Sequence, residues 1–242
     1  RVLSSGAPTG AKDNSVYSAA QAQGLAACPS PRPVISCSPA KYTPPHNLEP
    51  EPRSNIHCIG KPYTAQGNVR GRGELLDVAP PVPLPGAFVA AGYVFSRSEL
   101  LSQVPYDPYL YFDQEEIMYA LRIYTHGWDL FSARKTFIYH FYNVGNASGR
   151  PLHWKDLKDA KDNERYAFLA SRGLSRMNHL TGHRASADAA VLADIDKYGL
   201  GRVRTQEQYQ DHAGIDLKNK IVHPKAFQGG FVPDLGKYRK RP

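Results

Sequence analysis

Cysteine, methionine and tryptophan are scarce in this chain of 242 residues, which has three, two and two of them. The cysteines, Cys28, Cys37 and Cys58, are odd in number, and none belongs to a Cys-x-x-Cys pair. This pattern disfavours a disulfide framework and a cysteine zinc site, and a reducing compartment fits it best. We therefore expect an intracellular protein.

Long apolar runs are also missing, because no stretch of about 18 consecutive apolar residues occurs. We therefore expect no membrane span, and no secretory signal is visible. The first residue is Arg1 rather than methionine, for which a cleaved organellar transit peptide is one explanation. Together with the basic charge, this favours a mitochondrial over a cytoplasmic location.

Acidic residues are outnumbered, since 22 Asp and Glu face 30 Lys and Arg and give a net charge of +8. Such a surface favours an anionic neighbour, such as nucleic acid, a nucleotide or an acidic protein. Cationic residues gather at the C-terminus, where RNA or an acidic surface can contact them; these are Lys237, Arg239, Lys240 and Arg241. The alternative is a solvated tail with no ligand.

Composition divides the chain into three parts. Residues 1–13 are small and polar, and we expect an N-terminal arm there. Residues 14–221 carry the hydrophobic periodicity of a folded domain. Residues 222–242 combine Gly, Pro and basic residues, so we expect a tail that orders only against a partner.

Start and stop signals predict several helices. They cover residues 15–27, 97–104, 113–126 and 204–215. Ser96 and Glu99 form a capping box for the second, and Thr205 opens the last. For the third, Asp113 is the expected N-cap and Gly127 the expected terminator. Residues 155–200 are expected to be helical, with breaks at Gly173 and Gly199.

Apolar and alternating stretches predict the strands. They are "VISCS" (34–38), "AFVAAGYVFS" (87–96) as one buried strand or two short strands crossing Gly92, material within residues 67–78, and parts of "WDLFSA" and "TFIYHFY". Residues 39–57 hold four prolines after Pro39, which indicates a long surface loop. Because helices and strands alternate along the chain, we expect the α/β class.

Two adjacent carboxylates, Glu115 and Glu116, stand at the head of the helix predicted over residues 113–126. Neighbouring helical residues point about 100° apart, so both cannot face one substrate group squarely. One of them can project into a cleft as a base or as a partner of a sugar hydroxyl. The alternative is that both only stabilise the helix start through its dipole.

Other candidates have an equally plain alternative. His140 in "IYHFY" is either a core histidine or a metal ligand that needs companions elsewhere. Trp128 and the tyrosines, among them Tyr106, can stack on a sugar or fill the core. Gly92 within a strand permits a ligand to approach closely.

The order of several motifs resembles the C-terminal part of GlcNAc-transferases that modify hydroxyproline on a cytoplasmic protein, and of their bacterial relatives. The motifs are "FVAAGYVFS", "PYDP", "YFDQEEI", "THGWD" and the aromatic-flanked His140. "CPSPRPVIS" and "KYGLGRVRTQEQYQDHAGIDLKNK" resemble the segments on either side, so that the resemblance covers residues 28–220.

The resemblance implies a GT-A (Rossmann-like) glycosyltransferase fold that takes a UDP-sugar and a divalent metal, usually Mn²⁺. It places Glu115 and Glu116 toward the acceptor or the reacting sugar, His140 in the metal site, Gly92 in the sugar pocket, and Tyr106, Asp107 and Trp128 on substrate-binding motifs. Mn²⁺ and UDP-GlcNAc are expected as ligands only if the chain is active.

The departures from the family pattern are specific. The family has an acidic metal motif before the helix that precedes "CPSP", whereas this chain has "RVLSSGAPTGAKD" there. The family's Gly before the two glutamates is Gln114. A metal that bridges a diphosphate needs carboxylate ligands. We therefore expect a partial GT-A fold that lacks its N-terminal donor-binding half.

Three functional hypotheses follow. The first is a structural subunit of a larger assembly that has lost donor and metal binding, which the basic charge, the arm and the tail favour. The second is the active half of a UDP-GlcNAc-dependent glycosyltransferase, with its donor half on another segment or a partner chain. The third is a module that binds an anion or nucleic acid through its tail.

Overall fold

A computed structural model describes residues 21–43, 47–48, 53–136, 138–142, 160–230 and 234–238. Its main sheet has four strands in the order β6-β8-β1-β7. They are β6 (Leu84–Pro85), β8 (Asp129–Ser132), β1 (Pro33–Ser36) and β7 (Val94–Ser96). β1 runs parallel to β8 and antiparallel to β7, and its four residues are all buried, as suits a central strand.

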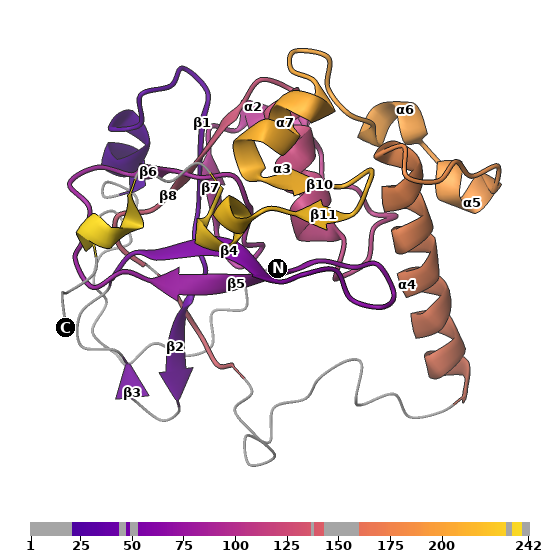
Figure 1. Cartoon of the computed structure of the whole chain (residues 1–242), viewed down its shortest axis with the longest axis horizontal. Helices are drawn as coiled ribbons and strands as arrows, with labels where there is room; N and C mark the ends of the chain where they lie inside the picture. Colours follow the sequence, from indigo (N-terminus) through magenta and orange to yellow (C-terminus); the bar gives the residue numbers. More distant parts are fainter. Residues whose placement is uncertain are drawn as a thin grey trace.

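A long hairpin crosses the middle of the molecule in Figure 1. Its strands, β4 (Asn55–Lys61) and β5 (Arg70–Leu75), pair antiparallel with an irregularity between Ile59 and Lys61. Smaller pairings surround it: β2 (Ala40–Thr43) joins β3 (Asn47–Leu48) and β9 (Tyr139–His140), and β10 (Ile215–Asp216) joins β11 (Ile221–Val222).

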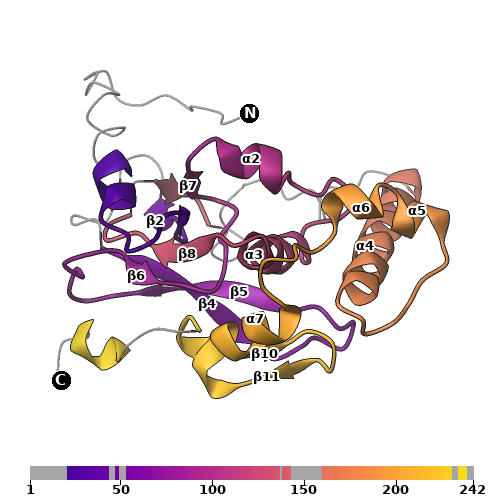
Figure 2. The ribbon, with the colours of Figure 1, turned by 90° about the horizontal axis from the view of Figure 1, so that it is seen from above.

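The helices surround these sheets. They are α2 (Glu99–Gln103), α3 (Glu115–Thr125), α4 (Ala160–Leu180), α5 (Ala189–Leu192), α6 (Ile195–Tyr198) and α7 (Gln206–Ala213), followed by two short 3₁₀ segments, η1 (Pro224–Gln228) and η2 (Leu235–Tyr238). α4 stands at one side of the fold with α5 and α6 beside it (Figures 1 and 2). This mixture of helices with parallel and antiparallel strands confirms the expected α/β class.

The core forms around α3, in which eight of the 11 residues are buried. The helix is therefore enclosed on nearly every side, beyond the single apolar stripe that its sequence shows. Each fully buried large apolar side chain contributes roughly 1.5–3 kcal/mol to stability, so this packing holds α3 in place. Among the described residues, every helix is too short or too polar to cross a lipid bilayer.

Several predicted boundaries are confirmed. β1 and β8 lie where their apolar runs predict, and α7 follows Thr205 with a complete capping box. Gly127 ends α3 with a φ of 85°, a backbone conformation that favours glycine. Residues 21–26 are helical, whereas residues 15–20 of the helix predicted there lie outside the described part. The N-terminal arm, residues 1–13, lies outside it as well.

The prediction of a surface loop over residues 39–57 is wrong. β2, β3 and the start of β4 lie within it, and in the sequence the prolines fall between these strands. β2 ends at Thr43, directly before Pro44. Proline cannot donate to a sheet, so it stands where a strand stops.

Most of the segment predicted as extended, residues 87–96, is not a strand: residues 87–90 are irregular and residues 91–92 form a turn. Only β7 is extended, and the Tyr93 N–H donates to the Ala90 carbonyl at 3.1 Å across the turn. The hydroxyl of Ser36 accepts from the Ala90 N–H and donates to the Tyr93 carbonyl, both at 2.9 Å. A side chain therefore satisfies backbone groups that a strand partner would otherwise take.

Three predicted helix signals are wrong. Ser96 does not cap α2, because its hydroxyl donates to the Pro33 carbonyl; the N-cap is Ser98, with no side-chain hydrogen bond. Asp113 does not cap α3, since it pairs with Arg70 at 3.0 Å. α4 runs unbroken through Gly173.

The C-terminal segment packs on its own chain where the structure describes it. Leu235 of η2 is buried against apolar residues of β4 and neighbouring segments, and the Tyr238 carbonyl accepts from the N–H groups of Asp77 and Val78. The expectation of a tail that orders only against a partner is therefore wrong for residues 222–230 and 234–238.

Candidate functional site

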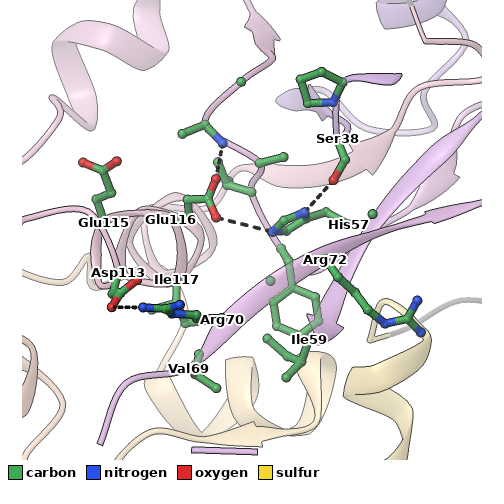
Figure 3. A pocket seen from close by; sticks show the side chains of 18 of the residues that line it. Ser38, His57, Ile59, Val69, Arg70, Arg72, Asp113, Glu115, Glu116 and Ile117 are labelled. Atoms are coloured by element: carbon green, nitrogen blue, oxygen red, sulfur yellow. Dashed lines mark hydrogen bonds and ion pairs between the residues drawn. The ribbon is translucent and has the colours of Figure 1, made fainter. Parts of the chain in front are cut away.

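A cavity of about 620 Å³ opens at the N-terminal end of α3 (Figure 3). The β4–β5 hairpin forms one wall, the turn before β7 forms a second, and β9 with the residues after it closes a third. The polar side chains that line it are Ser38, His57, Arg70, Arg72, Asp113, Glu115, Glu116, His140 and Tyr142. Both predicted carboxylates therefore reach the same cavity.

Glu116 is fixed by contacts from two directions. One carboxylate oxygen, Oε1, accepts the Ala91 N–H at 2.7 Å. The other, Oε2, lies 3.6 Å from Nε2 of His57. About a third of the side chain stays exposed, so the carboxylate is anchored and still faces the cavity.

His57 is in turn fixed from behind. Its Nδ1 lies 2.8 Å from the hydroxyl of Ser38, and its side chain is only 9% exposed. An ionised carboxylate has no hydrogen to donate and can only accept hydrogen bonds. The arrangement therefore favours a ring with its proton on Nε2, facing Glu116, while Nδ1 accepts from Ser38.

Gly71 makes room for this ring. A Cβ at position 71 would lie 2.0 Å from Nε2 of His57 and 2.5 Å from Cε1. Along β5, glycines alternate with Arg70, Arg72 and Glu74. Successive residues of a strand point to opposite faces, so the face that carries Gly71 and Gly73 has no side chains at these two positions. The imidazole lies on this bare face.

The two glutamates have opposite pKa shifts. Burial raises the pKa of Glu115 to about 7, and the neighbouring charge of Glu116 adds to the effect. Burial also acts to raise the pKa of Glu116, but the contact with His57 and the Ala91 N–H outweigh it, and the pKa lies below its usual value. Paired titratable groups with separated pKa values divide acid–base roles between them.

The start of α3 is held by polar contacts rather than by an N-cap side chain. Gln114 is the N-cap residue, and its amide donates to Oδ1 of Asn68 at 2.7 Å. Glu115 and Glu116 follow in the first turn, where the helix dipole favours negative charge. Figure 3 shows their carboxylates pointing in different directions.

His140, which the resemblance assigns to a metal site, lines the cavity from β9. Its ring lies 4.5 Å from that of Tyr142, and the hydroxyl of Tyr142 donates to the Pro39 carbonyl. Within the described ranges, no three His, Cys, Asp or Glu side chains come close enough to hold a metal ion. The residues that the structure describes therefore do not by themselves fit the expected Mn²⁺ site.

Gly92 also lines the cavity. A Cβ there would lie 2.6 Å from Cγ of Pro39, so glycine lets the turn approach the segment before β2. Its expected role in a sugar pocket stays a prediction, and its place in the cavity lining is compatible with that role.

Three predicted substrate-binding residues are absent from the cavity lining. Trp128 is fully buried, and its indole N–H donates to Gln103; an enclosed ring cannot stack on a sugar, so its expected role does not fit. Asp107 is buried in an ion pair with Arg176. Tyr106 is partly exposed and packs on Tyr119, with the ring centroids 4.9 Å apart.

The predicted anion-binding tail is described only in part. Lys237 is exposed in η2, while Arg239, Lys240 and Arg241 lie outside the described residues. η2 packs on Ile56 and Cys58, which alternate with His57 along β4 and therefore face away from the cavity. Lys237 is not a member of the cavity lining.

Sequence reasoning missed His57, Ser38 and Gly71. His57 fell in the segment interpreted as a proline-rich loop, and Ser38 at the end of a predicted strand. The signal that was available is the alternation of glycine and charged residues in "RGRGE", because glycine in a strand indicates close approach of another group.

Comparison with known proteins agrees with the resemblance at the level of the family. The family model described as "Glycosyltransferase (GlcNAc)" matches residues 17–219, which is most of the chain. No curated protein and no solved structure matches the chain significantly. The matched residues extend from before β1 to just after β10, and they include every residue of the cavity lining. The chain therefore belongs to the GlcNAc glycosyltransferase family.

Proposed function

We propose that the chain is an active part of a glycosyltransferase that takes N-acetylglucosamine from UDP-GlcNAc, and that the cavity at α3 is where the sugar is transferred. The observation that carries this proposal is the pair of carboxylates in one cavity, one anchored and ionised, the other with a pKa of about 7. Transfer to a hydroxyl needs both a partner for the sugar and a base.

Glu115 takes the role of the base. The acceptor oxygen forms a bond to the anomeric carbon of the sugar, the bond from that carbon to the UDP oxygen breaks, and UDP leaves with the electron pair. The hydroxyl proton passes to the Glu115 carboxylate. A base whose pKa lies near the working pH is well suited to this step.

Glu116 takes the role of sugar partner. Its oxygens keep lone pairs beyond those used by Ala91 and His57, so they can accept hydrogen bonds from a sugar hydroxyl or amide. Arg70 lines the same cavity and is mostly exposed, so its guanidinium can pair with a phosphate of the donor.

The test is release of UDP from UDP-GlcNAc by the full chain, with water as acceptor, in parallel series with Mn²⁺ and with EDTA. We expect Glu115→Gln to lower kcat about 100-fold or more, the usual contribution of a general base. The matched control is Glu99→Gln, which removes a carboxylate from the first turn of α2, outside the cavity. Equal rates for Glu115→Gln and the unaltered chain would refute the role of Glu115.

A structural subunit without donor binding is the second candidate. What favours it is the segment before Cys28, where Asp13 is the single acidic residue in the region that the resemblance assigns to the metal motif. The net charge of +8 suits contact with acidic subunits or RNA. Absence of both UDP-GlcNAc binding and UDP release, with stable co-purification in a larger complex, would favour this function over transfer.

A further inference from the structure

Ser38, His57 and Glu116 form a chain of polar contacts that joins three segments far apart in the sequence. The Ser38 hydroxyl meets Nδ1 of His57 at 2.8 Å, and Nε2 of His57 meets the Glu116 carboxylate at 3.6 Å. Figure 3 shows the ring between the serine and the carboxylate, with one ring nitrogen toward each. The chain ends on the carboxylate that faces the cavity.

We propose that His57 is a positioning residue for sugar binding: it holds the Glu116 carboxylate toward the cavity as an acceptor for the hydroxyl and amide groups of a hexosamine, with Ser38 orienting the ring. This inference deepens the proposed function and rests on it for the identity of the ligand. The geometric part, that His57 orients Glu116, stands on the contacts alone.

The local structure supports a fixed ring. His57 is in the middle of β4, paired opposite Gly73, and it is almost fully buried. Gly71 and Gly73 leave the face of β5 open, and a Cβ at either position would meet His57, Asn55 or Ser38 at less than 3.0 Å. The ring therefore occupies the face of the hairpin that these two glycines leave open.

The Ala91 N–H adds a second constraint on the same carboxylate. It lies in the turn that Ser36 supports, and it donates to the oxygen that His57 does not contact. A carboxylate with one oxygen on a backbone N–H and the other beside an imidazole has little freedom to rotate. It presents its remaining lone pairs in one direction, which is what recognition of a particular sugar hydroxyl requires.

A merely structural role, in which His57 only ties the hairpin to α3, makes a different prediction. It would affect folding but not the properties of Glu116 in the folded chain. Two measurements separate the roles: titration of the Glu116 carboxyl by carbon-detected NMR, and the division of kinetic effects between KM and kcat. Uniform binding of substrate and transition state changes KM and leaves kcat alone.

The variants are His57→Ala, His57→Gln and Gly71→Ala, with Gly60→Ala as matched control. Gly60 belongs to the same hairpin, and a Cβ there meets Arg72 and the Arg70 carbonyl at 3.3 Å rather than the imidazole. Thermal melts select variants that fold. His57→Gln retains an amide donor that can face Glu116, so it provides the conservative replacement.

We expect His57→Ala and Gly71→Ala to raise the titration midpoint of Glu116 and to raise KM for UDP-GlcNAc about tenfold, the size expected when a sugar's hydrogen bond to a charged carboxylate is weakened. We expect kcat to change less than about twofold in both variants. His57→Gln should recover most of the KM, and Gly60→Ala should leave the titration midpoint of Glu116 unchanged.

An unchanged Glu116 titration in His57→Ala would overturn the inference, as would a loss confined to kcat. Failure of the proposed function is a separate outcome: the unaltered chain would then show no turnover of UDP-GlcNAc, while the NMR titration would still decide whether His57 orients Glu116.

Discussion

The carboxylate of Asp107 and the guanidinium of Arg176 lie 2.7 Å apart, and neither side chain is exposed to solvent. Arg176 also donates to the carbonyls of Val191 and Ala193, at 2.6 and 2.8 Å. The pair therefore joins the loop before α3 to α4 and to the segment around α5. Asp107, a predicted substrate residue, is instead the internal counter-charge of this junction.

Removal of one partner should destabilise the fold strongly. Asp107→Ala would leave a buried guanidinium without its carboxylate, and we expect the free energy of unfolding to fall by about 3–5 kcal/mol. Urea denaturation measures it. The matched control is Asp77→Ala, which removes a half-exposed pair with Arg53 at 3.3 Å and should cost at most about 1 kcal/mol. Retained stability with lost UDP-GlcNAc binding would restore the substrate role of Asp107.

A substitution at Gly173 tests whether helix propensity or packing determines stability where α4 lies close to Tyr111 and Gln114. Alanine is better than glycine inside a helix by about 1 kcal/mol. A Cβ at position 173 would, however, lie 2.6 Å from Oε1 of Gln114 and 2.9 Å from the backbone nitrogen of Tyr111. Backbone cannot yield as a flexible side chain can, and overpacking costs about 1–3 kcal/mol.

We therefore expect Gly173→Ala to lower the free energy of unfolding by about 1–2 kcal/mol despite its better propensity. Chemical denaturation followed by circular dichroism measures the change. Ser171→Ala, at an exposed position of the same helix, should be neutral or stabilising by a few tenths. A Gly173→Ala chain more stable than the original would show that α4 shifts away from the Tyr111 loop.

The capping box of α7 gives a purely local prediction. The Gln208 N–H donates to the hydroxyl of Thr205 at 3.2 Å, and the Thr205 N–H donates to the side chain of Gln208 at 2.8 Å. Thr205→Ala removes the first of these, and we expect a loss of about 1 kcal/mol in unfolding free energy. Thr205→Ser keeps the hydroxyl and should retain most of the stability in the same thermal and urea melts.

The start of α7 was predictable because both capping groups lie within four residues of sequence. The start of α3 was not, since Asp113 is drawn to Arg70 and Gln114 to Asn68, contacts that only the folded chain creates. Sequence motifs brought Glu115, Glu116, Gly92 and His140 to one cavity. They did not separate the two glutamates, because that difference comes from Ala91 and His57, which are distant in sequence.

The wrong predictions for Trp128, Asp107 and Gly173 have one physical cause: contacts with residues distant in the sequence. Trp128 and Asp107 belong to motifs that resemble a sugar transferase, yet burial gives them structural roles. Gly173 satisfies a local rule for a helix break, but tertiary packing requires a residue without a side chain there. The local sequence limits which conformations a residue can adopt, and contacts with distant residues decide which of them occurs in the fold.

The titration of Glu115 predicts an unusual dependence of stability on pH. Its pKa is raised by burial, and by the charge of Glu116, from 4.5 to about 7. Between these values the folded chain holds a proton that the unfolded chain has released, so the free energy of unfolding contributed by Glu115 falls as pH rises. The contribution is fully present below pH 4.5 and is lost above about pH 7.

Glu115→Gln should abolish this slope, and above pH 7 it should exceed the unaltered chain in stability by about 1–2 kcal/mol, after allowance for solvent screening. Glu116→Gln is the matched control of opposite sign: the pKa of Glu116 is lowered, so its carboxylate stabilises the fold above its unfolded pKa, and the variant should be less stable at neutral pH. Urea melts from pH 4 to pH 9 compare the three chains. Parallel pH profiles for Glu115→Gln and the unaltered chain would show that Glu115 titrates normally, and its role as a base near neutral pH would then lose its physical ground.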